Sequence, residues 1–137
     1  MEKVNISPDQ INRFIGILEG ESETELTEFV FFEDINIVFN YRSYIDNMIE
    51  KLRNQIKSID FAVETFSLMK IGFDEKDVKE SKIELDVSIS QYSDYLNHVN
   101  ELIEHRQNHC QHKWEVVGNT SHQDLERCSK CGKEDWV

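Results

Sequence analysis

The chain has 137 residues, of which 27 are acidic and 15 are basic, so its formal net charge at pH 7 is −12. Nucleic acids are polyanions, and most of such a surface should repel them, whereas a basic surface on a protein partner would be attracted. No run of about 18 apolar residues occurs, so we expect no membrane-spanning helix.

The first segment, residues 1–39, is predicted to be helical. Ser7 is a candidate cap, because it is followed by Pro8 at the first helical position and by Gln10 at the third, which is a capping-box arrangement. Ser22 with Glu25 forms a second candidate cap after an acidic linker. We therefore expect two helix starts in this segment.

Residues 28–41 leave two structures open. The continuous apolar run Phe29–Phe32 suits a buried helix. The alternation from Ile35 to Tyr41 has the period of a strand and suits a short β-hairpin that turns at Glu33 and Asp34. We favour a helix, because the segment that follows has a strongly helical pattern.

Residues 40–108 are predicted to form an antiparallel, coiled-coil-like helical hairpin. Apolar side chains recur at steps of four and three from Tyr41 to Phe73, with Gln55 as the polar exception, and again from Leu85 to Ile103. A short polar connection joins the two runs. Two helices alone have a thin core, so residues 1–39 are expected to cover one side. A homodimer through the hairpin is one way to cover the other.

The third segment, residues 109–137, gathers all three cysteines in two pairs of candidate ligands. Cys128 and Cys131 are spaced to hold one metal ion and are followed by Gly132, which permits a tight turn. Zn²⁺ prefers four tetrahedral nitrogen and sulfur ligands. We therefore predict one structural zinc ion per chain. The predicted ligands are Cys110, His112, Cys128 and Cys131.

Two alternatives to His112 stay open, because His109 and His122 lie nearby in the sequence. Between the ligand pairs, a strand-like run begins at Trp114, and a second run leads back to Cys128 after a turn. This pattern predicts a β-hairpin. Arg127 and Lys130 flank the second pair and are expected to lower the pKa of its thiols. So short a unit buries little core, so the metal is expected to supply its folding energy.

The pattern Cys-x-His-x-Trp at Cys110–Trp114, with Cys128-x-x-Cys131-Gly132 and a late tryptophan, resembles the zinc-ribbon tails of many small bacterial and bacteriophage proteins. The resemblance covers about a fifth of the chain and is specific for zinc, but it says little about function. It implies the same four ligands, with Trp114 as a packing residue.

We predict that the chain is not an enzyme. A closed site of four protein ligands leaves no position for a reactive water molecule. The phosphate-binding and hydrolase motifs that are recognisable in a sequence do not occur. A redox-active cysteine pair and two free thiols without metal are the remaining alternatives for Cys128 and Cys131; the redox pair normally requires a βαβ setting.

Charge is distributed unevenly along the chain. Residues 1–39 hold two basic and nine acidic side chains, residues 40–105 hold eight and thirteen, and residues 106–137 hold five of each. The first hypothesis is therefore an acidic protein-binding module, such as an inhibitor or adaptor encoded by a phage or mobile element and acting on a host protein, which we expect to have a basic surface.

The alternative function is a nucleic-acid-associated zinc ribbon, which would use the basic residues of the tail: Lys113, Arg127, Lys130 and Lys133. Residues 1–105 are not expected to contribute to nucleic-acid binding, because they are acidic and nucleic acids are also negatively charged.

The N-terminal residues show no secretory pattern, and three cysteines are an odd number for a disulfide framework. We therefore predict a cytoplasmic location, in the host cytoplasm if the chain is phage-encoded.

Overall fold

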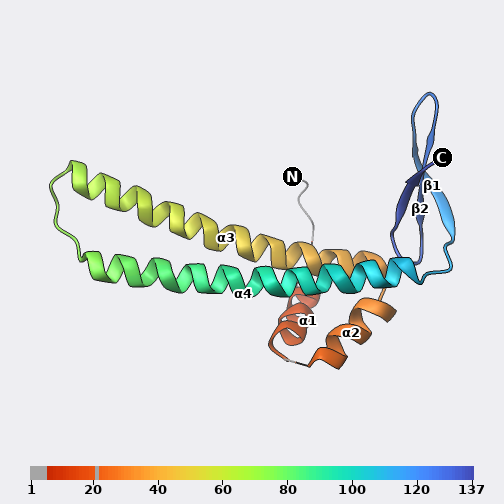
Figure 1. Cartoon of the computed structure of the whole chain (residues 1–137), viewed down its shortest axis with the longest axis horizontal. Coiled ribbons are helices and arrows are strands. Elements are labelled where there is room, and N and C mark those ends of the chain that lie inside the picture. Colours follow the sequence, from red (N-terminus) through yellow and green to blue (C-terminus); the bar gives the residue numbers. More distant parts are fainter. Residues whose placement is uncertain (1–5, 21) are drawn as a thin grey trace. The chain divides into compact units, whose positions relative to one another are not determined.

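The computed structural model describes residues 6–20 and 22–137 of the chain. These residues form four helices followed by a three-stranded antiparallel sheet, which confirms the predicted fold class (Figure 1). Within the described ranges, no helix is both long and apolar enough to cross a membrane. The elements are α1 (Pro8–Glu19), α2 (Glu23–Phe32), α3 (Ile35–Leu68), α4 (Glu75–Asn108), β1 (Trp114–Asn119), β2 (Asp124–Cys128) and β3 (Glu134–Trp136).

Both predicted serine caps are present. The hydroxyl of Ser7 accepts a hydrogen bond from the backbone N–H of Gln10 at the start of α1 (3.2 Å). The hydroxyl of Ser22 accepts one from the backbone N–H of Glu25 at the start of α2 (3.2 Å). Each bond satisfies one of the backbone donors that have no partner in the first turn of a helix.

Residues 28–41 are helical on both sides of a two-residue break at Glu33 and Asp34, so the β-hairpin alternative is not formed. The Asp34 carboxylate accepts a hydrogen bond from the backbone N–H of Asn36 (2.9 Å) as α3 begins. Ile35, Val38 and Tyr41 are buried, and their spacing of three places them on one face of α3.

The chain divides into two compact units, of which unit 1 consists of Met1–Tyr44 and His98–Val137. Its helical core contains an aromatic cluster contributed by α1, α2 and α3. The ring of Phe14 meets those of Phe29 and Tyr41 edge-on, with centroids 6.4 and 5.2 Å apart. Phe14 and Tyr41 are completely buried, as is Val99 of α4. The N-terminal segment thus covers one side of this end of the hairpin, as expected.

Unit 2 consists of Ile45–Asn97, which comprises most of α3, the connection and most of α4. No residue from position 50 to position 97 is fully buried, and Phe61 is 71% exposed. Gln55 was expected in the apolar seam, but it is exposed, and Ile56 takes the half-buried position beside it. The seam shifts because a straight helix drifts away from an exact seven-residue repeat. The homodimer stays a prediction.

Candidate metal centre

The strand pairing of the C-terminal sheet brings the two predicted ligand pairs together. Cys110 and His112 lie between the end of α4 and the start of β1, whereas Cys128 ends β2 and Cys131 lies in the turn before β3. Trp114, at the start of β1, pairs with Cys128 in the antiparallel β1–β2 ladder. The register therefore places the first pair beside the second.

The four predicted ligands converge in the structure, with all ligand atoms within 4.8 Å of one another. The sulfurs of Cys110 and Cys128 are 3.7 Å apart, and the sulfur of Cys131 is 3.3 Å from Nδ1 of His112. Around a tetrahedral ion with metal–sulfur bonds of about 2.3 Å, neighbouring sulfurs lie about 3.8 Å apart. The four donor atoms and the distances between them therefore fit a bound metal ion.

The turn that carries the second pair is closed by backbone hydrogen bonds. The N–H of Gly132 donates to the carbonyl of Cys128 (2.9 Å), and the N–H of Lys113 points at the sulfur of Cys128 (3.4 Å). Gly132 has a φ of +74°, which a residue with a side chain adopts only with strain. The glycine after the second cysteine is therefore required by the backbone, as the sequence indicated.

The two buried thiols differ in acidity. Burial raises the pKa of Cys128, but hydrogen bonds from His112 and from backbone amides, that of Lys113 first, outweigh burial and lower it to about 6. Burial and the neighbouring sulfurs raise the pKa of Cys131 to about 12. The thiolate form is therefore favoured at Cys128, whereas a thiolate at Cys131 requires a positive charge nearby, which a metal ion would supply.

The basic neighbours do not act as predicted from the sequence. Arg127 was expected to lower the thiol pKa values, but its guanidinium pairs with the carboxylate of Glu134, with Nε 2.8 Å from Oε1. Lys130 contributes through its backbone amide. The prediction is correct in direction for Cys128, although local amides and an imidazole lower its pKa, and it is wrong for Cys131, whose pKa is raised.

The last turn of α4 holds the cysteine turn from one side. The guanidinium of Arg106 donates to the carbonyl of Lys130 (2.7 Å), and the amide of Gln107 donates to the carbonyl of Cys131 (3.1 Å). Lys130 and Cys131 are both in the turn that the Gly132–Cys128 hydrogen bond closes. The candidate metal centre is therefore attached to the helices of unit 1 by side chains that the sequence pattern did not single out.

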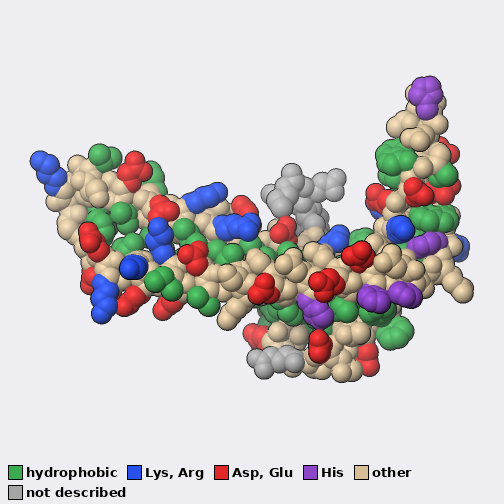
Figure 2. Space-filling model, in the orientation of Figure 1, with side chains coloured by type: hydrophobic (Ala, Val, Ile, Leu, Met, Phe, Trp, Pro, Cys, Tyr) green, Lys and Arg blue, Asp and Glu red, His purple; other side chains and the backbone are tan. Residues whose placement is uncertain are grey.

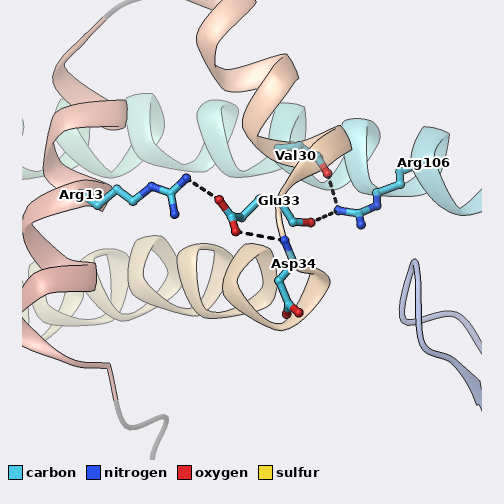
Figure 3. Close-up of polar contacts among 5 residues, drawn as sticks. All are labelled: Arg13, Val30, Glu33, Asp34 and Arg106. Carbon is cyan, nitrogen blue, oxygen red and sulfur yellow. Dashed lines mark hydrogen bonds and ion pairs between the residues drawn. The ribbon is translucent and has the colours of Figure 1, made fainter.

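Arg106 also joins this turn to the end of α2. Its other terminal nitrogen, Nη1, donates to the carbonyls of Val30 (2.9 Å) and Glu33 (2.7 Å), which have no helical partners of their own (Figure 3). Glu33 lies in the two-residue connection between α2 and α3, and its carboxylate forms an ion pair with Arg13. One arginine thus caps α2 and holds the cysteine turn.

The structure separates the three histidine candidates. His112 is a member of the cluster, and its ring lies 4.8 Å from that of Trp114, which makes Trp114 a packing neighbour. His109 instead stacks on His105, with its Nδ1 2.9 Å from the His105 carbonyl. His122 lies exposed in the β1–β2 turn. Neither His109 nor His122 belongs to a metal-ligand cluster among the described residues.

Comparisons with family models, with curated proteins and with solved structures produced no match to this chain. The four-residue cluster is consistent with the suspected zinc ribbon, but no family is recognised from it.

Proposed function

We propose that the chain is a non-enzymatic module that binds other proteins and contains one structural zinc ion. The observation that carries the proposal is the closed cluster of three sulfurs and one imidazole, with all ligand atoms within 4.8 Å. Four protein ligands complete a tetrahedral zinc site and leave no position for a substrate or water molecule. Thiolate and imidazole donors favour zinc over magnesium or calcium, which prefer oxygen.

Protein binding is supported by exposed apolar side chains on the sheet and, separately, by the acidic charge of residues 1–105. On the sheet, Val116 is 60% exposed and Trp136 is 50% exposed, and Figure 2 shows hydrophobic side chains at its surface. Exposed apolar patches with polar surroundings are typical of interaction sites. The net charge of −12 favours a partner with a basic surface. Action as an inhibitor or adaptor on a host protein rests on the same acidic charge, whereas a phage or mobile-element origin rests on the resemblance of the tail.

The nucleic-acid alternative has weaker support. Arg127, one of four basic residues proposed for it, is engaged by Glu134. The tail from residue 106 carries equal numbers of basic and acidic residues. Phosphate contacts require an excess of positive charge, so we favour protein binding.

The proposed function is tested by capture on the immobilised full chain. Beads carrying the zinc-loaded chain, and beads carrying polyglutamate as a control for acidity, receive the same nuclease-treated lysate at 0.15 M NaCl. We expect at least one protein to be retained in stoichiometric amounts on the chain alone. Duplex DNA binding is measured in parallel by fluorescence anisotropy. A retained set identical to that on polyglutamate, or DNA binding with a steep salt dependence, would overturn the proposal.

A further inference from the structure

A groove of about 500 Å³ lies between α1 and α2 in unit 1. Its apolar walls include Ile17 of α1 and Phe29 of α2, which are 8% and 6% exposed. Gly16 lines the same groove, and a Cβ built on it would meet no atom within 4 Å. The missing side chain therefore leaves open space beside a preformed apolar surface.

Phe32 lines the groove at the last residue of α2 and is 84% exposed. A phenylalanine ring this open to water gains more from burial by a partner than a scattered aliphatic side chain. Aromatic anchors beside a desolvated pocket are typical of the centres of protein interfaces. The groove thus combines an apolar wall with an exposed aromatic rim.

The charges around the groove are unbalanced. Among the residues that the structure describes, Glu25, Glu28 and Glu33 line it with a single cation, Arg13. Arg13 is engaged by the Glu33 carboxylate and lies over the ring of Phe29, 5.2 Å from its centroid. Among the described residues, neither Glu25 nor Glu28 forms an ion pair. An occupant with positive charges next to its apolar side chains complements this surface.

We infer that the groove binds a basic amphipathic helix of a protein partner. An aliphatic side chain of that helix occupies the space beside Gly16 and packs on Phe29 and Phe32, while lysine or arginine side chains approach Glu25 and Glu28. This is the helix-in-groove mode of recognition, with charge selecting the partner. The inference rests on the proposed function, because it names the partner's chemistry and its place on the chain.

Three fluorescein-labelled synthetic peptides test the chemistry of the occupant. The first has 15 residues, with leucine on one helical face and lysine on the other. The second replaces every lysine with glutamate, and the third replaces every leucine with alanine. Binding to the full zinc-loaded chain is measured by anisotropy at 0.15 M NaCl. We expect the first peptide to bind at least tenfold more tightly than either control. Equal binding of the first and third would overturn the inference by showing that charge alone acts.

Two variants test the place of binding. Gly16→Leu fills the groove, and we expect it to weaken binding of the first peptide at least tenfold. Gly72→Leu is the matched control, because a Cβ at Gly72 also meets no atom within 4 Å and this residue lies outside the groove. We expect its affinity to stay within twofold of the wild type. Circular dichroism verifies that both variants are folded. Unchanged affinity in a folded Gly16→Leu chain would place the peptide elsewhere and contradict the inference.

Other occupants give distinct results, each of which overturns the inference. If residues 1–5 occupy the groove, deleting them tightens peptide binding at least tenfold. If a second copy does, Gly16→Leu lowers the native mass from dimer to monomer. Failure here is also separable from failure of the proposed function. If the Gly16→Leu chain still captures the same partner as the wild type, the groove assignment is wrong while protein binding stands.

Discussion

Gly132 lies directly against the ring of Phe39, so closely that a Cβ built on the glycine would come within 2.5 Å of the ring carbon Cε2. Ile35 is the next neighbour, with its Cγ1 at 3.1 Å from the same point. The turn that carries Cys128 and Cys131 therefore packs on the first turns of α3. The candidate metal centre and this end of the helices share one packed structure.

We expect Gly132→Ala to destabilise the chain by about 2–5 kcal/mol. The left-handed backbone conformation costs roughly 1–2 kcal/mol for a residue with a Cβ, and the overlap with Phe39 adds the cost of overpacking, about 1–3 kcal/mol. Urea denaturation followed by circular dichroism measures the free energy of unfolding. Gly72→Ala is the control and should change it by less than about 0.5 kcal/mol. Equal effects of the two variants would show that the contact is unimportant.

Arg106→Met should lower the free energy of unfolding by about 2–4 kcal/mol, because charge-assisted hydrogen bonds to three carbonyls are lost. Arg106→Lys should have an intermediate effect, since an ammonium group keeps the charge but cannot span the same acceptors. Arg53→Met is the control, because Arg53 is exposed in the middle of α3. If Arg106→Lys matches the wild type, the fork geometry of the guanidinium is not required.

The ion pair of Glu33 with Arg13 predicts a pH dependence of stability. The hydrogen bond from Arg13 is the main cause that holds the pKa of Glu33 below its ordinary value of 4.5 in the folded chain. The pair therefore stabilises the fold above pH 4.5 and loses this contribution as the pH falls through the lower, folded pKa. At pH 7 the wild type should exceed Glu33→Gln by up to about 1 kcal/mol, because the pair is partly exposed.

Urea titrations of both chains between pH 7 and pH 3 measure this difference. It should shrink as the pH falls below 4.5 towards the lowered pKa of Glu33, because protonation of the carboxylate in the folded chain removes the ion pair. Glu80→Gln is the control, since the Glu80 carboxylate is exposed in its pair with Lys76. A difference that grows on acidification would contradict the assignment.

If the cluster holds the proposed zinc ion, a chelator should loosen the sheet but leave most of the helical signal. The two tryptophans of the chain, Trp114 and Trp136, both lie in the sheet, so tryptophan fluorescence reports on that region. We expect a shift in fluorescence as Trp114 loses its contact with His112, with less than a quarter of the far-UV helical signal lost. Fluorescence that does not respond to chelation would argue against a structural metal.

Much of the fold follows from local signals in the sequence. Ser7 and Ser22 mark helix starts through hydrogen bonds to residues only three positions away, and short spacings and one hairpin bring the four candidate ligands together. The strand-like alternation before Tyr41 was misleading, because the buried residues of α3 actually recur at helical spacing. Gln55 is exposed for a related reason. The prediction extended an exact seven-residue repeat along α3, whereas the apolar face of a straight helix drifts away from such a repeat.

The attachment of the metal centre to the helices could not be predicted from the sequence. Arg106 binds the carbonyls of Val30, Glu33 and Lys130, and any residue type offers such an acceptor. Phe39 likewise gives no sign in the sequence that it faces Gly132. Contacts to backbone atoms leave no pattern in the sequence, and neither does a contact that depends on a glycine having no side chain. The glycine was correctly linked to the turn, but its neighbour depends on the tertiary fold.

Zinc K-edge X-ray absorption on the purified, zinc-loaded chain tests the central claim most directly. It should show three sulfur ligands at about 2.3 Å and one nitrogen ligand at about 2.0–2.1 Å. His112→Ala should lose the imidazole component, whereas His122→Ala should leave the spectrum unchanged, because His122 is outside the cluster. A first shell of nitrogen and oxygen without sulfur, or a chain that retains no zinc while its three thiols titrate freely, would contradict the structural zinc centre.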